Sequence, residues 1–385
     1  MKVPVSIADT SGKMRTGSKS IIFDVLTKDV GCPPEITISK PACLVIDGQA
    51  TVMSLGKPSD VSTFGEYASM FVKHILKQNE AYERIEVTFN RYRDLSIKDG
   101  TRAKRTKKSR PIRRLIEDGD VPLPQKWTDL LASTDNKKDL CLFLSNALIA
   151  EAPSEKTIVV VGGFAAGTEV QSTDPTMTTT LLEGNHEEAE TRVVLHCIHS
   201  NAQTIVVSAR DTDILILLLA HFSKCTCLQL WLKAGTLKKP KYVPIHTIRD
   251  QLGLSDQVYQ TMLAFHAITG CDTVSYLSGH SKKSAWGVFT EHHHLLKDLG
   301  KYPTLSKEVT EDAEKFICHI YKSSSQNCDK ARVKLFTKCR APDSMPPSSD
   351  AAQFHIQRAN YQSLVWREAF IPNQLFPPRL TPDGS

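Results

Sequence analysis

The chain is 385 residues long, with a hydrophobic content of 41% and a formal net charge of +6 at pH 7. This composition is typical of a globular protein with a large core, in one domain with an appendage or in two domains. The apolar run at 214–220 is far shorter than the roughly 20 residues of a membrane-spanning helix. The first 20 residues lack the apolar region of a secretory signal, and the ten cysteines lack the paired spacing of a zinc site. We therefore expect a protein of the nucleus or cytoplasm that is not secreted and has no contact with membranes.

Short apolar runs predict buried strands after an N-terminal extension at 1–40. Four such runs are rich in β-branched residues and cover 42–48, 84–90, 157–163 and 204–213. Because they lack polar alternation, they are typical of strands buried on both faces of a parallel sheet. Helical patterns at 63–78 and 187–199 separate them. This alternation predicts an α/β fold, with a mostly parallel sheet flanked by helices.

The rest of the chain divides into edge strands, helices and a tail. The segments 228–233 and 241–246 are expected to add edge strands. From about residue 255 onward the pattern is helical, and proline-rich stretches after residue 340 mark loops and a loose tail. We therefore expect a main domain at 41–300 and a helical C-terminal region at 301–385.

A strongly basic segment interrupts the predicted sheet. Residues 91–114 contain eleven Lys and Arg against two Asp, a net charge of +9. Since 101–137 also has no clear apolar period, we expect a basic arm at about 91–137 between the second and third strands. Such an arm binds phosphate backbone without reading bases, but a run of charge is also typical of a solvated face or a nuclear-localisation tract. The run alone leaves these readings open.

Acidic residues gather where the predicted strands end. Asp47 closes the first strand, and Asp211 and Asp213 follow the fourth. In a strand, residues two apart point to the same side, so both carboxylates of this pair are expected to face one cation. Carboxyl ends of parallel strands meet at one edge of a sheet, and clustered carboxylates favour Mg²⁺ or Mn²⁺ over zinc. The alternative is that these acids are separate helix caps.

Four short motifs in this order resemble the flap endonuclease/XPG group of the PIN-like nuclease superfamily. They are VIDG at 45–48, EAE at 188–190, DTDI at 211–214 and GCDT at 270–273, and the resemblance spans about 42–294. The chain also resembles a sparsely characterised animal branch of this group. The resemblance implies a PIN-like core and two divalent ions, Mg²⁺ or Mn²⁺. It implies the metal-site residues Asp47, Asn90, Glu188, Glu190, Asp211, Asp213 and Asp272.

The same resemblance implies residues that hold nucleic acid. Lys98 and Arg105 have the seven-residue spacing of the basic pair that steers the scissile phosphate in this family, and are the expected catalytic cations. Residues 270–294 resemble the family's helix–two-turn–helix, which holds a duplex backbone. The expected nucleic-acid contacts are Arg102, Lys104, Lys107, Lys108, Gly279, Lys282 and Lys283.

One residue departs from the family's pattern. Asn90 stands where the family's second-strand motif normally ends in Asp. Asparagine offers an oxygen ligand without a negative charge, which weakens metal binding. The main hypothesis is therefore a Mg²⁺-dependent endo- or exonuclease of flap endonuclease type, or a weakened descendant, that cleaves branched or single-strand/duplex-junction DNA. RNA remains open as a substrate. The alternatives are a non-catalytic nucleic-acid-binding protein with the same fold and a protein-interaction scaffold.

Overall fold

A seven-stranded sheet forms the centre of the computed structural model, which describes residues 4–77, 80–92, 112–236, 239–337 and 341–374. The strand order is β4-β3-β2-β1-β5-β6-β7. All neighbours from β3 to β6 pair in parallel, whereas the two edge strands β4 and β7 are antiparallel. The strands are β1 Ala42–Asp47, β2 Arg84–Thr88, β3 Thr157–Val161, β4 Val170–Ser172, β5 Thr204–Ser208, β6 Gln229–Thr236 and β7 Lys239–Pro244. The predicted α/β class and mostly parallel sheet are confirmed.

The order in which strands are added to the sheet reverses beside β1. After β1 it adds β2 and β3 on one side, and then crosses to add β5 and β6 on the other. β1 and β5 are direct neighbours, with Ile46 opposite Ser208. In open α/β sheets, ligands bind beyond the carboxyl ends of strands at such a switch point. The acids at the carboxyl ends of β1 and β5 therefore lie at the edge of the sheet where a ligand site is expected.

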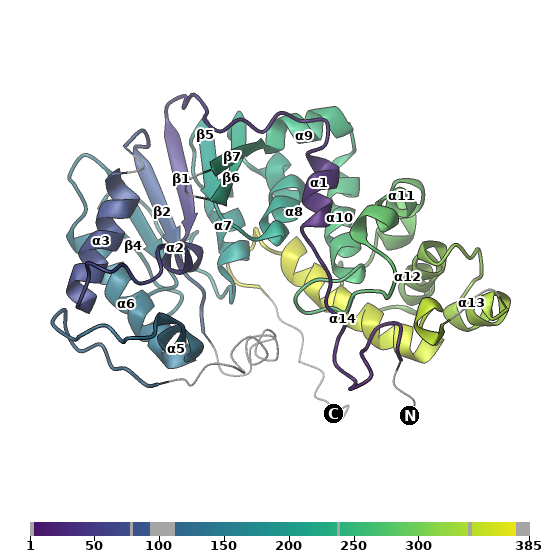
Figure 1. The fold of residues 1–385 in the computed structure, drawn as a ribbon. Coiled ribbons are helices and arrows are strands. Elements are labelled where there is room, and N and C mark those ends of the chain that lie inside the picture. Colours follow the sequence, from purple (N-terminus) through teal and green to yellow (C-terminus); the bar gives the residue numbers. More distant parts are fainter. Residues whose placement is uncertain (1–3, 78–79, 93–111, 237–238, 338–340, 375–385) are drawn as a thin grey trace.

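Helices cover both faces of the sheet (Figure 1). On one face, α3 (Phe64–Lys77), α5 (Trp127–Ala132) and α6 (Thr134–Ala150) pack on alternate residues of the strands. On the other, α7 (Ala189–Ile198), α8 (Thr212–His221) and α10 (Asp256–Ile268) pack on the intervening residues. The helices predicted at 63–78 and 187–199 are confirmed as α3 and α7. Since both faces are covered, the strands need no polar alternation.

The remaining helices surround this core. They are α1 Ile21–Leu26, α2 Gly48–Leu55, α9 Ile245–Leu252, α11 Lys282–His292, α12 Lys307–Ile320, α13 Cys328–Leu335 and α14 Ser349–Arg367, with 3₁₀ turns at Phe222–Lys224, His293–Leu296 and Pro342–Ser344. Among the described helices, none combines the length and the apolarity that crossing a membrane requires.

The basic arm predicted at 91–137 includes a segment that belongs to the core. Trp127, Leu130 and Leu131 of α5 are buried against the sheet-covering helices, so this part of the chain is packed and not an exposed arm. The sequence missed it because α5 is only six residues long, too short to show a helical period. The most basic stretch, 93–111, lies outside the described residues.

The N-terminal extension and the C-terminal helices share the main hydrophobic core. Ile22 and Leu26 of α1 are buried in the same cluster as α8 and α10. Ala359 and Trp366 of α14 belong to it as well, and α14 lies along α10 (Figure 1). The regions at 1–40 and 301–385 are therefore packed against the main domain over their described parts.

Two buried histidines fasten the C-terminal helix to the core. His221 Nε2 lies 2.8 Å from the carbonyl oxygen of Trp366, and His355 Nε2 lies 2.7 Å from that of Ile268. Carbonyl oxygens only accept hydrogen bonds, so each Nε2 carries a proton and donates it. Burial lowers the pKa of both imidazoles to about 4, so both rings are neutral at neutral pH.

We expect acid to destabilise the fold between about pH 6.5 and pH 4. The unfolded chain binds these protons near its ordinary pKa of about 6.5, whereas the folded chain does not, so the free energy of unfolding falls as pH drops through this window. His355→Gln keeps a donor for Ile268 without titrating, and should flatten the pH dependence measured by urea unfolding. The exposed His294→Gln is the control, and equal flattening in both variants would contradict the prediction.

Candidate metal centre

Asp211 and Asp213 belong to the start of a helix and not to a strand, which corrects the expectation from the sequence. β5 ends at Ser208, and Asp211 is the N-cap of α8. The Asp211 carboxylate accepts a hydrogen bond from the backbone N–H of Asp213, at 2.9 Å. Unpaired N–H groups and the helix dipole stabilise carboxylates at this position. The pair therefore sits together because helix α8 begins there.

Glu190 of α7 joins this pair. One carboxylate oxygen from each of Glu190, Asp211 and Asp213 lies within 4.8 Å of the other two. Glu190 stands in the first turn of α7, with Glu188 as its N-cap. Asn90, which follows β2, accepts a hydrogen bond from the Ala189 N–H at 2.8 Å. The residue that departs from the family pattern thus fixes the start of the helix that carries Glu190.

A lysine from the N-terminal extension lies among the acids. The Lys19 ammonium is 2.6 Å from Asp211 Oδ1, 3.0 Å from Asp213 Oδ2 and 3.6 Å from Asp272 Oδ1. Burial acts to lower the pKa of Lys19, but Asp213, Asp211, Glu190 and Asp272 raise it more strongly, so its net pKa lies well above the ordinary value. The lysine is therefore charged, and it belongs to no motif that sequence reasoning had singled out.

Asp272 is held in place by a tight loop after α10. Gly270 has a φ of +106°, and a Cβ there would come within 2.6 Å of the Tyr276 ring, so glycine is required. The Cys271 N–H bonds the Val274 carbonyl at 3.0 Å, which closes the turn. The Thr273 hydroxyl donates to Gln362 of α14 at 2.6 Å. The C-terminal helix thereby fixes the loop that brings Asp272 to the other acids.

A neutral histidine supports Asp213 from behind. His266 Nε2 lies 2.8 Å from Asp213 Oδ1. Burial, followed by the charge of Lys282, lowers the pKa of His266 to about 4, although Asp213 acts in the opposite direction. The neutral ring donates its Nε2–H to the carboxylate. Such partners orient the carboxylates of metal sites.

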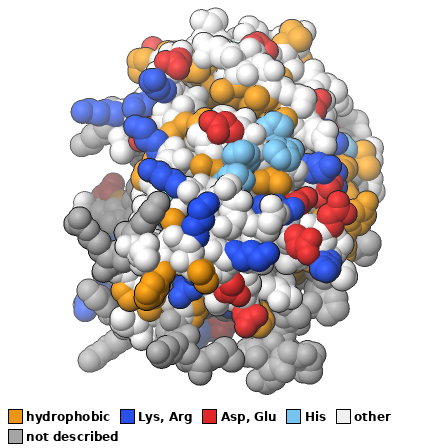
Figure 2. All heavy atoms as spheres, turned by 90° about the vertical axis from the view of Figure 1, so that its right-hand side faces the viewer, with side chains coloured by type: hydrophobic (Ala, Val, Ile, Leu, Met, Phe, Trp, Pro, Cys, Tyr) orange, Lys and Arg blue, Asp and Glu red, His pale blue; other side chains and the backbone are white. Residues whose placement is uncertain are grey.

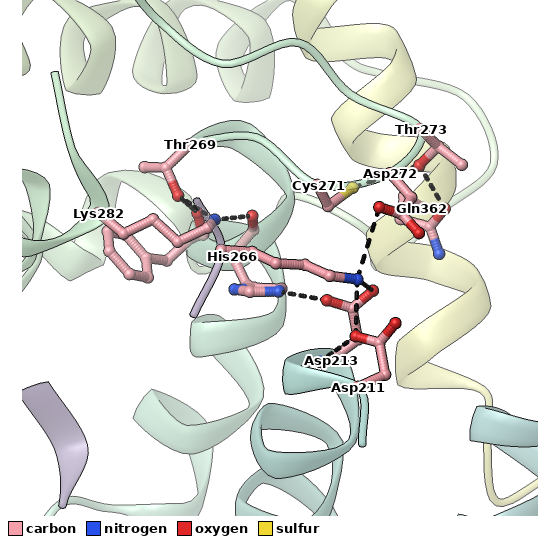
Figure 3. A network of polar contacts seen from close by, with 11 residues as sticks. Asp211, Asp213, His266, Thr269, Cys271, Asp272, Thr273, Lys282 and Gln362 are labelled. Atoms are coloured by element: carbon pink, nitrogen blue, oxygen red, sulfur yellow. Dashed lines mark hydrogen bonds and ion pairs between the residues drawn. The ribbon is translucent and has the colours of Figure 1, made fainter. Parts of the chain in front are cut away.

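Lys282 is buried, which corrects its predicted role as a contact for duplex phosphates. Its side chain is 1% exposed, and the ammonium donates to the His266 carbonyl at 2.6 Å and to Thr269 Oγ1 at 2.8 Å (Figure 3). Burial lowers the pKa of Lys282 to about 7. The sequence could not separate this lysine from its neighbour Lys283, which is exposed. Lys282 ties α10 to α11 and has no surface for a nucleic acid.

The other predicted residues fall into three groups. Asp47 is the N-cap of α2 and accepts a hydrogen bond from the Ala50 N–H at 2.9 Å. Gly279 and Lys283 are exposed at the start of α11, and Figure 2 shows that the face on this side of the molecule carries both basic and acidic side chains. Their contact with nucleic acid stays a prediction. Six further predicted residues lie outside the described part of the chain: Lys98, Arg102, Lys104, Arg105, Lys107 and Lys108.

The donor set fits a hard divalent cation. The three clustered side chains offer only carboxylate oxygens, the ligands that Mg²⁺ and Mn²⁺ prefer. Lys19 shows that a positive charge is stable among them. The residues present therefore suit Mg²⁺ or Mn²⁺, in agreement with the ligand chemistry expected from the sequence.

A cavity of about 250 Å³ lies on the α3 side of the sheet, and its lining includes the basic residues Lys233 and Arg210 and the acid Glu35. Its lining includes Ile46 and Arg210, the residues directly before Asp47 and Asp211, together with Lys233 and His74. Burial lowers the pKa of Lys233, and burial together with the Lys233 charge lowers that of His74. In the described part of the chain, no carboxylate forms an ion pair with Lys233 or Arg210. Sequence reasoning missed this cavity because its residues come from distant elements.

Comparison with solved structures finds similar chains of low sequence identity. A bacteriophage T5 protein co-crystallised with metal ions is 13% identical, covering 83% of this chain and 99% of its own, with a TM-score of 0.41. The bacteriophage T5 flap endonuclease in a complex with DNA and metal ions is 12% identical, covering 85% and 99%, with a TM-score of 0.39. Human GEN1 in complex with Holliday junction DNA is 11% identical, covering 82% and 76%, with a TM-score of 0.36. No family model and no curated protein matches the chain.

We expect Mn²⁺ or Mg²⁺ to raise the free energy of unfolding through this centre. A ligand that binds only the folded chain stabilises it by about 2.7 kcal/mol when present at about 100 times its Kd. Glu190→Gln removes one of the three clustered carboxylates and should abolish most of this gain in thermal unfolding with and without metal. Glu183→Gln, an exposed acid seven residues earlier, should keep it. A stabilisation that survives Glu190→Gln would place the metal elsewhere.

Proposed function

We propose that the protein is a metal-dependent nuclease that hydrolyses phosphodiester bonds in branched or junction DNA. The observation that carries this proposal is the convergence of Glu190, Asp211 and Asp213, with Asp272 joined to them through Lys19. These acids come from the sequence motifs that resemble the flap endonuclease/XPG group, in the same chain order. Asp211 follows β5 at the switch point of the sheet, the edge at which open α/β sheets bind ligands.

The chain's own residues divide the work of such a site. Glu190, Asp211 and Asp213 would hold Mg²⁺ or Mn²⁺, and the neutral His266 fixes the orientation of Asp213. A bound ion of this kind activates water and stabilises negative charge on phosphate oxygens. Asp211 is partly exposed, with 26% of its side chain accessible, whereas Asp213 is 2% exposed. A phosphate would therefore approach from the Asp211 side.

The two basic residues of the cavity, Lys233 and Arg210, support binding of a phosphate backbone there. Lys233 is half-buried without a carboxylate partner among the described residues, so an anion would offset its desolvation. Arg210 lies on the same lining, directly before Asp211. We propose that a phosphate of the bound strand occupies this cavity.

Lys233→Met combined with Arg210→Met should weaken binding of branched DNA about equally for all sequences, and should lower its salt dependence, because only backbone charge is lost. Fluorescence anisotropy in EDTA at several salt concentrations measures this without cleavage. Lys239→Met with Lys241→Met, on the neighbouring strand β7, provides a control of equal charge. If both double variants lose the same affinity, the cavity has no special role.

A second candidate function is nucleic-acid binding without catalysis. Asn90 favours it, because an amide there adds no negative charge and its Oδ1 already accepts the Ala189 N–H. The same contact makes the position testable, since Asp at residue 90 keeps an acceptor for Ala189.

Cleavage of a branched DNA with Mg²⁺ or Mn²⁺ separates the two functions. If the site is catalytic, the unmodified protein should cut, Asn90→Asp should raise the rate by about tenfold through stronger metal binding, and Asp213→Asn should abolish cutting. Asn201→Asp, at an exposed position that also tolerates either residue, is the control. Absence of cleavage by both the unmodified and the Asn90→Asp protein would favour the non-catalytic function.

A further inference from the structure

We propose that Lys19 is a resident cation that takes the place of one of the two divalent ions expected for this centre, so that the centre holds a single metal ion. This rests on the proposed metal-dependent function and specifies its cofactor requirement. Lys19 contacts Asp211, Asp213 and Asp272, which come from two separate acidic motifs. The remaining ion is assigned to Glu190 with Asp211 and Asp213, the three side chains whose carboxylate oxygens lie within 4.8 Å of one another.

The ammonium and a second ion compete for the same oxygens. Lys19 Nζ is 2.6 Å from Asp211 Oδ1 and 3.0 Å from Asp213 Oδ2. Mg²⁺ binds oxygen at about 2.0–2.1 Å, so an ion bound between these two oxygens would lie in the space of the ammonium. Two positive charges in contact also repel strongly, because a partly buried site is weakly screened by water. Lys19 therefore excludes a second ion from the position between Asp211 Oδ1 and Asp213 Oδ2.

The chain before Lys19 is fixed to the helical part of the protein. The Arg15 carbonyl accepts a hydrogen bond from the Tyr276 N–H at 3.1 Å, and its guanidinium lies 3.6 Å from Asp343. A Cβ at Gly17 would clash with the Tyr276 ring, so the backbone lies directly against that ring. These contacts fasten the segment to the loop that follows Asp272.

The chain after Lys19 is fixed to the core. Ile22 is 0% exposed and Leu26 is 4% exposed, and α1 packs on α8 and α11. Asp211 is the N-cap of α8, so α1 rests on the helix whose start carries the acids. Because the chain is fixed on both sides of Lys19, the ammonium is held among the acids as a permanent part of the site.

Counting bound Mn²⁺ tests this inference. Titration of the full chain, followed by the EPR signal of free Mn²⁺ and by calorimetry, should give one ion for the unmodified protein. Lys19→Met removes the ammonium and keeps much of the side-chain volume, and should give two. Lys19→Arg keeps the charge and should give one. Lys13→Met, an exposed lysine on the same segment, is the control and should also give one.

Thermal unfolding in EDTA adds a measurement of the stability of the metal-free protein. Lys19→Met should lower the Tm of the metal-free protein, because Asp211, Asp213 and Asp272 lose their cation, and Mn²⁺ should restore it. Lys13→Met should change neither value.

Three outcomes decide the matter. Two ions in the unmodified protein would overturn the role of Lys19 and leave the metal-dependent function intact, and this count needs no variant to fold. One ion in both the unmodified and the Lys19→Met protein would also overturn it. No bound ion in any form would remove the metal-dependent function itself, and with it this inference.

Discussion

Mutual repulsion among carboxylates is the constraint on which the centre of this protein depends. Glu190, Asp211 and Asp213 lie close enough for their oxygens to share one cation, and Asp213 is almost fully buried. Like charges in such a place raise their own pKa values or destabilise the fold unless a positive charge lies between them. Here Lys19 supplies that charge from the other end of the chain. The N-terminal segment is thus part of the site and not an appendage to it.

The architecture explains how these acids meet. The crossover beside β1 leaves the carboxyl ends of β1 and β5 adjacent, and helices α7 and α8 begin at that edge. Helix N-termini supply unpaired N–H groups and a favourable dipole, which lower the cost of holding carboxylates there. The tight loop at Gly270 adds Asp272, and α14 holds that loop through Gln362. Elements from the whole length of the chain therefore converge on one edge of the sheet.

Buried polar groups behind the acids make the arrangement rigid. His266 is neutral and donates to Asp213, while Lys282 satisfies the carbonyl of the same histidine. A half-satisfied network of this kind would be costly in a core, so each partner restricts the others. Arg192 of α7 has a similar role, because its buried guanidinium donates hydrogen bonds to the carbonyls of His186 and Gly167. The orientation of Asp213 is in this way set by buried partners within the protein.

The sequence by itself determined the central strands, helices α3 and α7 and the acidic motifs, because apolar periodicity and strand-end acids are local signals. It misjudged Asp211 and Asp213 as strand residues, since a helix cap and a strand end differ only by a few backbone angles. It placed Lys282 on the surface, because burial of one lysine beside another depends on packing against α10. Lys19 is separated from Asp213 by 194 positions, and no pattern along the chain links them. Only the tertiary structure decided that contact, because the fold alone brings the N-terminal segment across the sheet edge where the acids lie.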